Sequence, residues 1–354
     1  MKTKVYINGI SSISAQTEAS VFVETPLVYM EAIFPAVPLD YKEYIPVKSL
    51  RRLSKALKMG ISGALMALKE GGEVVPDAII TGTGQGCKQD TERFLEALLD
   101  QDEELLSPTA FIHSTHNTIG GQIALYLQNK AYNITYSQNS ASLEWALLDA
   151  QMQLHSDVDA KNILVGGIDE ISKTITGFMK FDHQLKAESI SNIDLLNSNT
   201  AGTITSEGAH FFNLSSVPNI SSYAQLIDVS IKPFLSSEEL KEAIIDFLNT
   251  NNISVAAIDV VMLGKNGDVN YDIFYDRLEN DLFKETQQLA YKHLVGEYDT
   301  VSGYALWLAC KIIKNQSIPK FLKINKKNPS EINYILLYNQ YLGENHSFIL
   351  LKKY

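Results

Sequence analysis

The feature that most constrains the fold is an internal repeat with an offset of 182 residues. The segments DAIITGTGQG and DVVMLGKNGD are both short apolar runs that end in a glycine turn, with Gly82 opposite Gly264. The segments IGGQIALYL and VSGYALWL match as helices at the same offset, with Gly121 opposite Gly303. Two matches at one offset indicate duplication of an α/β unit. Each half is therefore expected to be a helix-flanked, mostly parallel sheet, with ligands at the carboxyl ends of its strands.

Hydrophobic periodicity divides the chain into three parts. We expect an N-terminal half over 1–175, an irregular connecting or interface segment over 176–235, with loops and short pieces from about 176 to 225, and a C-terminal half over 236–354. The helices expected from apolar spacing are 49–71, 90–99 with Asp90 as a possible N-cap, 116–129, a helix after 141, 236–251 and 301–315. The expected strands are 3–9, 76–86, 133–137, 162–171, 258–268 and a closing pair at 332–341 and 347–354.

Composition excludes several classes of function. The 354 residues carry a net charge of −11, which opposes binding to a nucleic-acid backbone. Cys87 and Cys310 show no metal-ligand spacing, and so few cysteines suit a reducing cytosol. No apolar run is long enough to span a bilayer, and the N-terminus lacks a signal-peptide core. We expect a cytoplasmic protein without a membrane span.

No motif for a metal or a cofactor is present in the sequence. His113 and His116 lie three residues apart, but a metal pair would need a third ligand. The GTGQG turn lacks the Lys-Ser/Thr of a phosphate-binding loop and the full dinucleotide fingerprint. We therefore expect neither a metal nor a cofactor.

The most suggestive candidate site is the segment NITYSQNSASLEWALLDAQMQL, residues 133–154. It predicts a strand, a sharp polar turn and a buried helix, and a helix N-terminus stabilises a thiolate or an oxyanion. Ser140 lies at this turn, but a serine hydroxyl needs an adjacent base to become a nucleophile. On these residues alone, a structural role for Ser140 is favoured over a catalytic one.

Six segments taken in order resemble the β-ketoacyl synthases of the thiolase-like fold. They are KVYINGISSIS, LSPTAFIHSTHNTIGGQIALYL, ITYSQNSASLEWALLDA, ILVGGIDEIS, TITSEGAHFFNL and YLGENHSFIL. The resemblance covers nearly the whole chain. It implies two duplicated α/β halves packed as a five-layer αβαβα sandwich.

The resemblance also implies that the condensing chemistry is lost. An active member uses a cysteine nucleophile, two histidines and a nearby lysine. The cysteine position holds Ser140 here, with Asn139 or Gln138 as the alternatives if the alignment shifts. Leu263 stands at the first histidine position and Glu297 at the second, while Lys292 is retained.

Chain-length factors are members of this family that lack those catalytic residues. The resemblance implies a non-condensing subunit that pairs with an active ketosynthase, receives an acyl carrier protein, and shapes the tunnel for a growing acyl or polyene chain. A fatty-acid, polyketide or aryl-polyene pathway is the context it suggests. The residues expected at the tunnel or the interface are Thr115, His116, Ile119, Tyr126, Asn133, Tyr136 and, at the gating position, Tyr341.

Two other functions stay open at this point. Ser140 could serve an acyltransferase or hydrolase acting on carrier-protein thioesters, with Glu297 or a histidine brought in by folding as its base. An active condensing enzyme with unconventional residues is the third possibility. The sequence does not decide between a homodimer and a heterodimer, and it does not identify the product.

Overall fold

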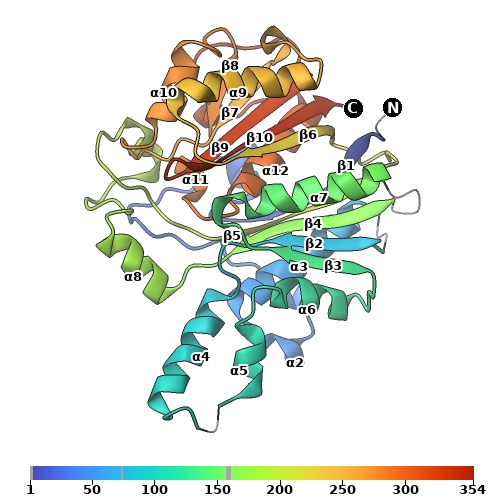
Figure 1. Ribbon diagram of the computed structural model, residues 1–354, viewed down its shortest axis with the longest axis vertical. Coiled ribbons are helices and arrows are strands. Elements are labelled where there is room, and N and C mark those ends of the chain that lie inside the picture. Colours follow the sequence, from blue (N-terminus) through green and yellow to red (C-terminus); the bar gives the residue numbers. More distant parts are fainter. Residues whose placement is uncertain (1–2, 73–74, 105, 157–160) are drawn as a thin grey trace.

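The computed structural model describes residues 3–72, 75–104, 106–156 and 161–354. Ten strands in these residues form one hydrogen-bonded sheet, in the order β3-β2-β4-β5-β1-β6-β10-β9-β7-β8 (Figure 1). Their bounds are β1 Val5–Ile13, β2 Ala78–Gly82, β3 Tyr132–Tyr136, β4 Asn162–Asp169, β5 Gly208–Ser215, β6 Ala224–Lys232, β7 Val260–Leu263, β8 Gln287–Ala290, β9 Tyr334–Tyr341 and β10 Glu344–Lys353.

The strand order confirms the duplication. From one edge of the sheet, the strands of the first half lie in the order β3-β2-β4-β5-β1. From the opposite edge, the strands of the second half lie in the order β8-β7-β9-β10-β6, so β8 corresponds to β3 and β7 to β2. In both halves the three strands farthest from the junction are parallel, and the remaining pairs are antiparallel. The halves are joined where β1 pairs with β6, over Val5–Ile7 only. Gly82 ends β2 and Gly264 follows its counterpart β7, as the repeat predicted.

The predicted match between the two glycine-bearing helices is wrong. Helix α6 (Thr118–Tyr126), which contains Gly121, precedes β3, whereas α12 (Ser302–Asn315), which contains Gly303, follows β8. The counterpart of α12 is therefore α7 (Ser142–Ser156), which follows β3. Gly303 faces the ring of His210, whereas Gly121 has open space beside it, so the two glycines play different roles and their common offset was coincidental.

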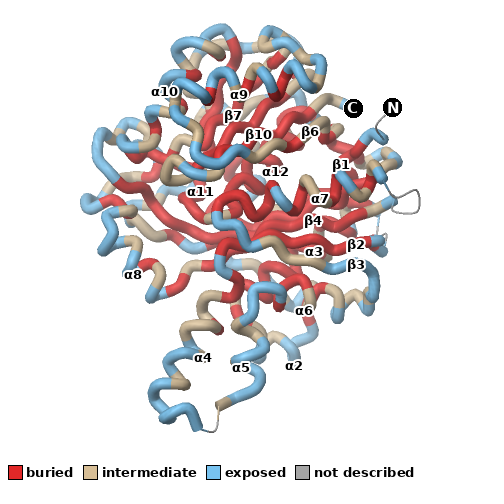
Figure 2. Tube along the Cα trace, in the orientation of Figure 1, coloured by how far each residue is buried: buried red, intermediate tan, exposed pale blue. Residues whose placement is uncertain are grey.

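The elements stack in five layers, as the resemblance implied (Figure 1). Helices α7 and α12 form the middle layer, and they share a core with both halves of the sheet. Helix α3 (Lys55–Glu70) and α6 cover one outer face, while α9 (Ser237–Thr250) and α10 (Ile273–Asn280) cover the other. Figure 2 shows the buried chain concentrated in the sheet and the middle helices.

Local sequence explains where the outer helices begin. Ser54 caps α3 by accepting a hydrogen bond from the Leu57 N–H, so α3 starts later than the expected residue 49. Ser236 and Glu239 form a capping box at the start of α9. The other α-helices of the described chain are α1 Glu18–Phe22, α2 Val47–Leu50, α4 Lys88–Asp100, α5 Pro108–His113, α8 Lys173–Phe181 and α11 Lys292–Val295.

Two expectations about local structure are corrected. Helix α4 begins after Cys87, so Asp90 lies inside the first turn, where its carboxylate pairs with Arg93. The segment expected to be loops and short pieces contains the regular strands β5 and β6, and the chain passes from one half-sheet to the other between them. Every residue of β5 is buried, and its polar His210 and Asn213 hid the strand pattern.

Candidate functional site

The carboxyl end of β8 leads into a buried ion pair. Helix α11 (Lys292–Val295) begins one residue after this strand, Gly296 is its C-cap, and Glu297 follows. The Lys292 ammonium lies 2.7 Å from Glu297 Oε2, and both side chains are almost completely buried. Asn266 Nδ2 donates to the same carboxylate oxygen at 2.8 Å, and Lys292 Nζ also donates to the Gln340 carbonyl at 3.3 Å. The structure thus brings two of the predicted site residues into direct contact.

Burial and neighbouring charges both shift the pKa values of the carboxyl groups at this centre. Burial raises the pKa of the Glu297 carboxyl, while the Lys292 ammonium and the Asn266 amide act against that shift. Burial also raises the pKa of Glu144, whose Oε1 accepts a hydrogen bond from Ser347 Oγ at 2.9 Å. Lys292 is close enough to Glu144 to stabilise its charged form. Sequence reasoning missed Glu144, although a glutamate on the apolar face of a helix is a visible signal.

Glu297 and Tyr341 line one small cavity of about 110 Å³. The Tyr341 hydroxyl donates to Gln184 Oε1 at 2.8 Å. Asp299 lines the same cavity, and Lys88 Nζ approaches its carboxylate to 3.9 Å. Burial, helped by the charge of Asp169, raises the pKa of Asp299 to about 7. Neither Lys88 nor Asp299 stood out in the sequence, because no motif marks them.

Asp299 should make the protein less stable as the pH rises from about 4 to 7. An unfolded aspartate loses its proton near pH 4, whereas the folded state keeps it until about pH 7. The folded state then binds more protons across this window, so the free energy of unfolding falls with pH, by at most about 1.4 kcal/mol per unit for one site. Asp299→Asn should flatten this slope in urea titrations at several pH values. Asp281→Asn, at an exposed carboxylate, is the matched control, and an unchanged slope in Asp299→Asn would contradict the assignment.

Ser140 lies in the predicted turn, and no base among the described residues is hydrogen-bonded to it. The turn is a short 3-10 helix (Asn139–Ala141) with a left-handed φ of +48° at Asn139, and it packs against β10. Ser140 is only 3% exposed. Among the hydrogen bonds of the described chain, none joins its hydroxyl to a histidine or a carboxylate. Instead Ser142 fastens the turn, because its Oγ donates to the Thr83 and Asn139 carbonyls and accepts from the Gln138 N–H. The strand–turn–helix shape predicted here is present.

Leu263 lies on the far side of the sheet from Lys292. Its side chain belongs to the core under α9 and α10. The next residue, Gly264, faces the ion pair: a Cβ at this position would lie 3.2 Å from Lys292 Cε and 2.5 Å from Asn339 Oδ1. Alternation along β7 requires this difference between neighbouring residues.

The predicted tunnel and interface residues, apart from Tyr341, lie around β3. Thr115 and His116 are exposed between α5 and α6, and Ile119 is buried under α3. The Tyr126 hydroxyl donates to the Tyr44 carbonyl at 2.5 Å. On β3, Asn133 donates to the Gly120 carbonyl at 2.9 Å, while burial and the charge of Asp149 raise the pKa of Tyr136 to about 12.

Three further observations concern metals, thiols and membranes. Within the residues that the structure describes, no cluster of three His, Cys, Asp or Glu side chains could hold a metal ion. Cys87 and Cys310 are buried free thiols. No helix in the described ranges combines the length and the hydropathy needed to cross a bilayer.

Comparisons with known proteins agree with this geometry. Residues 36–187 match the family model described as "Beta-ketoacyl synthase, N-terminal domain". No curated protein sequence matches the chain significantly. Among solved structures, the ishigamide ketosynthase/chain length factor and a β-ketoacyl synthase from Burkholderia phymatum STM815 each superpose with a TM-score of 0.80 at 14% identity, over 100% of both chains.

A ketosynthase in complex with its chain length factor from Xenorhabdus doucetiae superposes with a TM-score of 0.77 at 14% identity. It covers 99% of this chain and 98% of the other. Residues 36–187 are therefore similar to the N-terminal domain of the β-ketoacyl synthases, and the described chain has the fold of these ketosynthase structures.

Proposed function

We propose that this chain is a non-condensing subunit that pairs with an active ketosynthase and shapes the tunnel for its acyl chain. The observation that carries the proposal is the buried Lys292–Glu297 ion pair. A condensing site needs hydrogen-bond donors where an enolate oxygen develops. Here the retained lysine is neutralised by a carboxylate, which would repel that charge.

The other positions of the site support the same function. Ser140 is buried without a base, and a hydroxyl in that state is a poor nucleophile. Gly264 offers no side chain beside Lys292. The chain keeps the fold over the whole length of the ketosynthase structures, although the reactive groups are replaced. A chain of this kind can still provide a binding surface for a partner and one wall of its tunnel.

Strand β3 is the surface we assign to the partner ketosynthase. It is the edge of the sheet and, among the strands of the described residues, it pairs with β2 alone, which leaves its other side open. Trp145, Asp149 and Met152 lie on one face of α7, and Asp149 accepts a hydrogen bond from Tyr132 of β3. The exposed Tyr132, Trp145 and Met152 therefore form an apolar border along this edge.

Co-expression with a cysteine-containing ketosynthase should yield a stable heterodimer. The double variant Trp145→Glu/Met152→Glu should weaken it at least tenfold, because two charges would be buried in the interface. Size-exclusion chromatography with light scattering measures both results. Ile273→Glu is the control, since Ile273 is also exposed but lies on α10, far from β3 (Figure 1).

Two results would contradict this proposal. One is a chain that stays monomeric beside every such ketosynthase. The other is activity of the isolated chain: release of carbon dioxide from a malonyl carrier protein, or an acyl adduct by intact mass that disappears in Ser140→Ala.

The finer parts of the proposal concern the carrier protein and the pathway. Contact with an acidic acyl carrier protein is supported by exposed Lys48, Arg51 and Arg52, which stand close together on a chain of net charge −11. None of these three cations has an ion-pair partner within the described chain. We place the protein in the cytoplasm, in fatty-acid-, polyketide- or aryl-polyene-type biosynthesis.

A further inference from the structure

The outer edge of β1 contains a gap in its hydrogen bonding. At one end the Tyr223 N–H donates to the Ile7 carbonyl at 2.8 Å, and at the other the Val37 N–H donates to the Ser14 carbonyl at 2.8 Å. Between them the Ile10 N–H donates to Glu70 Oε2 at 2.5 Å instead of to a strand. Ile10 therefore directs its backbone groups away from β5.

The backbone groups of Ser12 point the same way as those of Ile10, because strand residues alternate in direction. The β1–β5 register is regular from Ile10 to Ile13, so Ser12 directs its N–H and C=O to the same outer edge as Ile10. Pairing with β6 stops at Ile7. No hydrogen bond of the described residues reaches the Ile10 carbonyl, the Ser12 N–H or the Ser12 carbonyl on this edge. The gap presents an acceptor, a donor and an acceptor in a row.

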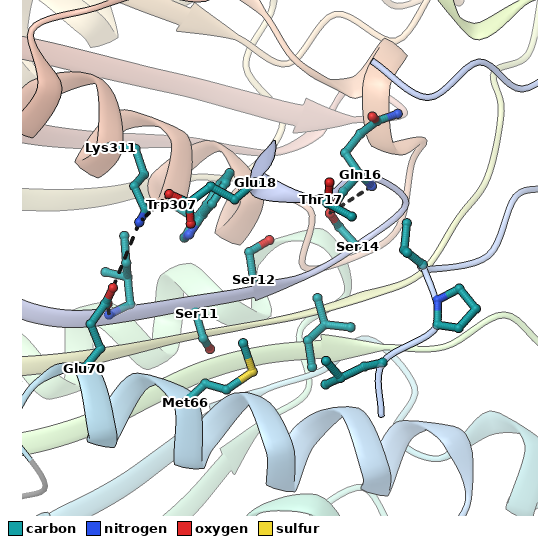
Figure 3. Close-up of a pocket in the computed structure, with 15 residues that line it drawn as sticks. Ser11, Ser12, Ser14, Gln16, Thr17, Glu18, Met66, Glu70, Trp307 and Lys311 are labelled. Carbon is teal, nitrogen blue, oxygen red and sulfur yellow. Dashed lines mark hydrogen bonds and ion pairs between the residues drawn. The ribbon is translucent and has the colours of Figure 1, made fainter. Parts of the chain in front are cut away.

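The gap forms one wall of a cavity of about 330 Å³ (Figure 3). Met66 of α3 lines one side of it and Trp307 of α12 the other, with Ser12 between them. Lys311 and Glu18 close one end with an ion pair of 2.9 Å. The cavity is apolar on two sides and polar along the strand, which is how a site for a small organic ligand is built.

We propose that this cavity binds one residue of a short extended peptide, which continues the β1 ladder. The N–H and the C=O that flank one Cα of an extended chain point to the same edge, so the carbonyl of this residue would accept from the Ser12 N–H and its N–H would donate to the Ile10 or Ser12 carbonyl. Apolar side chains of the peptide would contact Met66 and Trp307. A simple alkyl amide makes only one of the two bonds, because the N–H and C=O of a trans amide point in opposite directions. The inference does not depend on the partner ketosynthase.

The occupied cavity would be connected to the Glu297 cavity through the core. Ser12 Oγ lies 3.1 Å from His210 Nδ1, and His210 Nε2 lies 2.6 Å from the Tyr298 hydroxyl. Tyr298 lines the cavity that holds Glu297.

The test uses the full chain and a matched pair of probes. N-acetyl-leucine N-methylamide carries two peptide groups, and its depsipeptide analogue has an ester oxygen in place of the leucine N–H. Ligand-detected NMR titration should give at least tenfold tighter binding of the peptide, equal to about 1.4 kcal/mol. N-isobutylisovaleramide has a single trans amide, makes only one of the two bonds, and should also bind at least tenfold more weakly than the peptide.

Two variants at one position separate the backbone from the side chain. Ser12→Pro removes the outward N–H, which the β1–β5 ladder does not use, and should abolish binding. Ser12→Ala keeps that N–H and should bind within about threefold of the original chain. Met66→Trp, which fills the cavity from α3, should also abolish binding and covers the case in which Ser12→Pro does not fold.

Three results would overturn the proposal. They are binding of the ester analogue or of the single amide as tight as that of the peptide, retained peptide binding in a folded Ser12→Pro variant, and no saturable binding of the peptide up to about 10 mM.

Discussion

Glu297→Ala is expected to lower the free energy of unfolding by about 3–5 kcal/mol, because it leaves the Lys292 ammonium buried without its carboxylate. The Lys292 side chain is fully buried, and within the described residues its ammonium makes one other hydrogen bond, to the Gln340 carbonyl at 3.3 Å. The Asn266 amide would also lose its acceptor. Urea unfolding followed by circular dichroism measures the change.

The control for this variant is a surface pair of the same chemistry. Glu238→Ala removes the partner of Arg277 on the exposed face of α9, where water and salt screen the charges, so its effect should be small. The double variant Lys292→Met/Glu297→Leu removes both buried charges and should recover most of the stability that Glu297→Ala loses. A Glu297→Ala chain as stable as the Glu238→Ala chain would show that the centre is more solvated than the structure indicates.

The same variants bear on the proposed function. If the ion pair holds the shape of a surface for a partner, the double variant should keep both the fold and the heterodimer. If the pair had a chemical role, the double variant would fold and yet fail in a reconstituted assay with the partner ketosynthase. Stability and assembly measured on the same three proteins therefore separate the two roles.

The sequence predicted the architecture better than it predicted the contacts. The repeat of a strand and a glycine turn at Gly82 and Gly264 reflects backbone topology, which periodicity records. The meeting of Lys292 with Glu297 was not visible, because residues five apart do not face each other on a regular helix. They meet because α11 ends after one turn and the chain reverses at Gly296. The other contacts depend on side-chain direction, which the sequence does not give. Leu263 points into the outer core because of the alternation along β7. Glu144 is buried because the turn at Ser140 orients its face of the helix toward the core.

Gly296→Ala is expected to destabilise the protein by about 3 kcal/mol or more. Gly296 has φ +70° and ψ −177°, a combination that essentially only glycine adopts, and the backbone term alone costs about 1–3 kcal/mol. A Cβ at this position would also lie 2.7 Å from Ser206 Cβ. Ser206 cannot move away easily, because its N–H donates to the Glu297 carbonyl at 3.1 Å, and the Glu297 N–H donates to the Ile204 carbonyl at 2.8 Å.

The effect of Gly296→Ala should reach the ion pair as well as the overall stability. The reversal at Gly296 aims Lys292 and Glu297 at each other, so a shifted backbone would separate them and expose the cavity that Glu297 lines. Gly177→Ala is the matched control: Gly177 lies on the exposed face of α8 with open space around it, and alanine there should stabilise the helix by up to about 1 kcal/mol. Urea unfolding of the two variants should therefore shift in opposite directions. A Gly296→Ala chain with unchanged stability would mean that the segment from Ile204 to Ser206 yields, and that the ion pair does not depend on the reversal at Gly296.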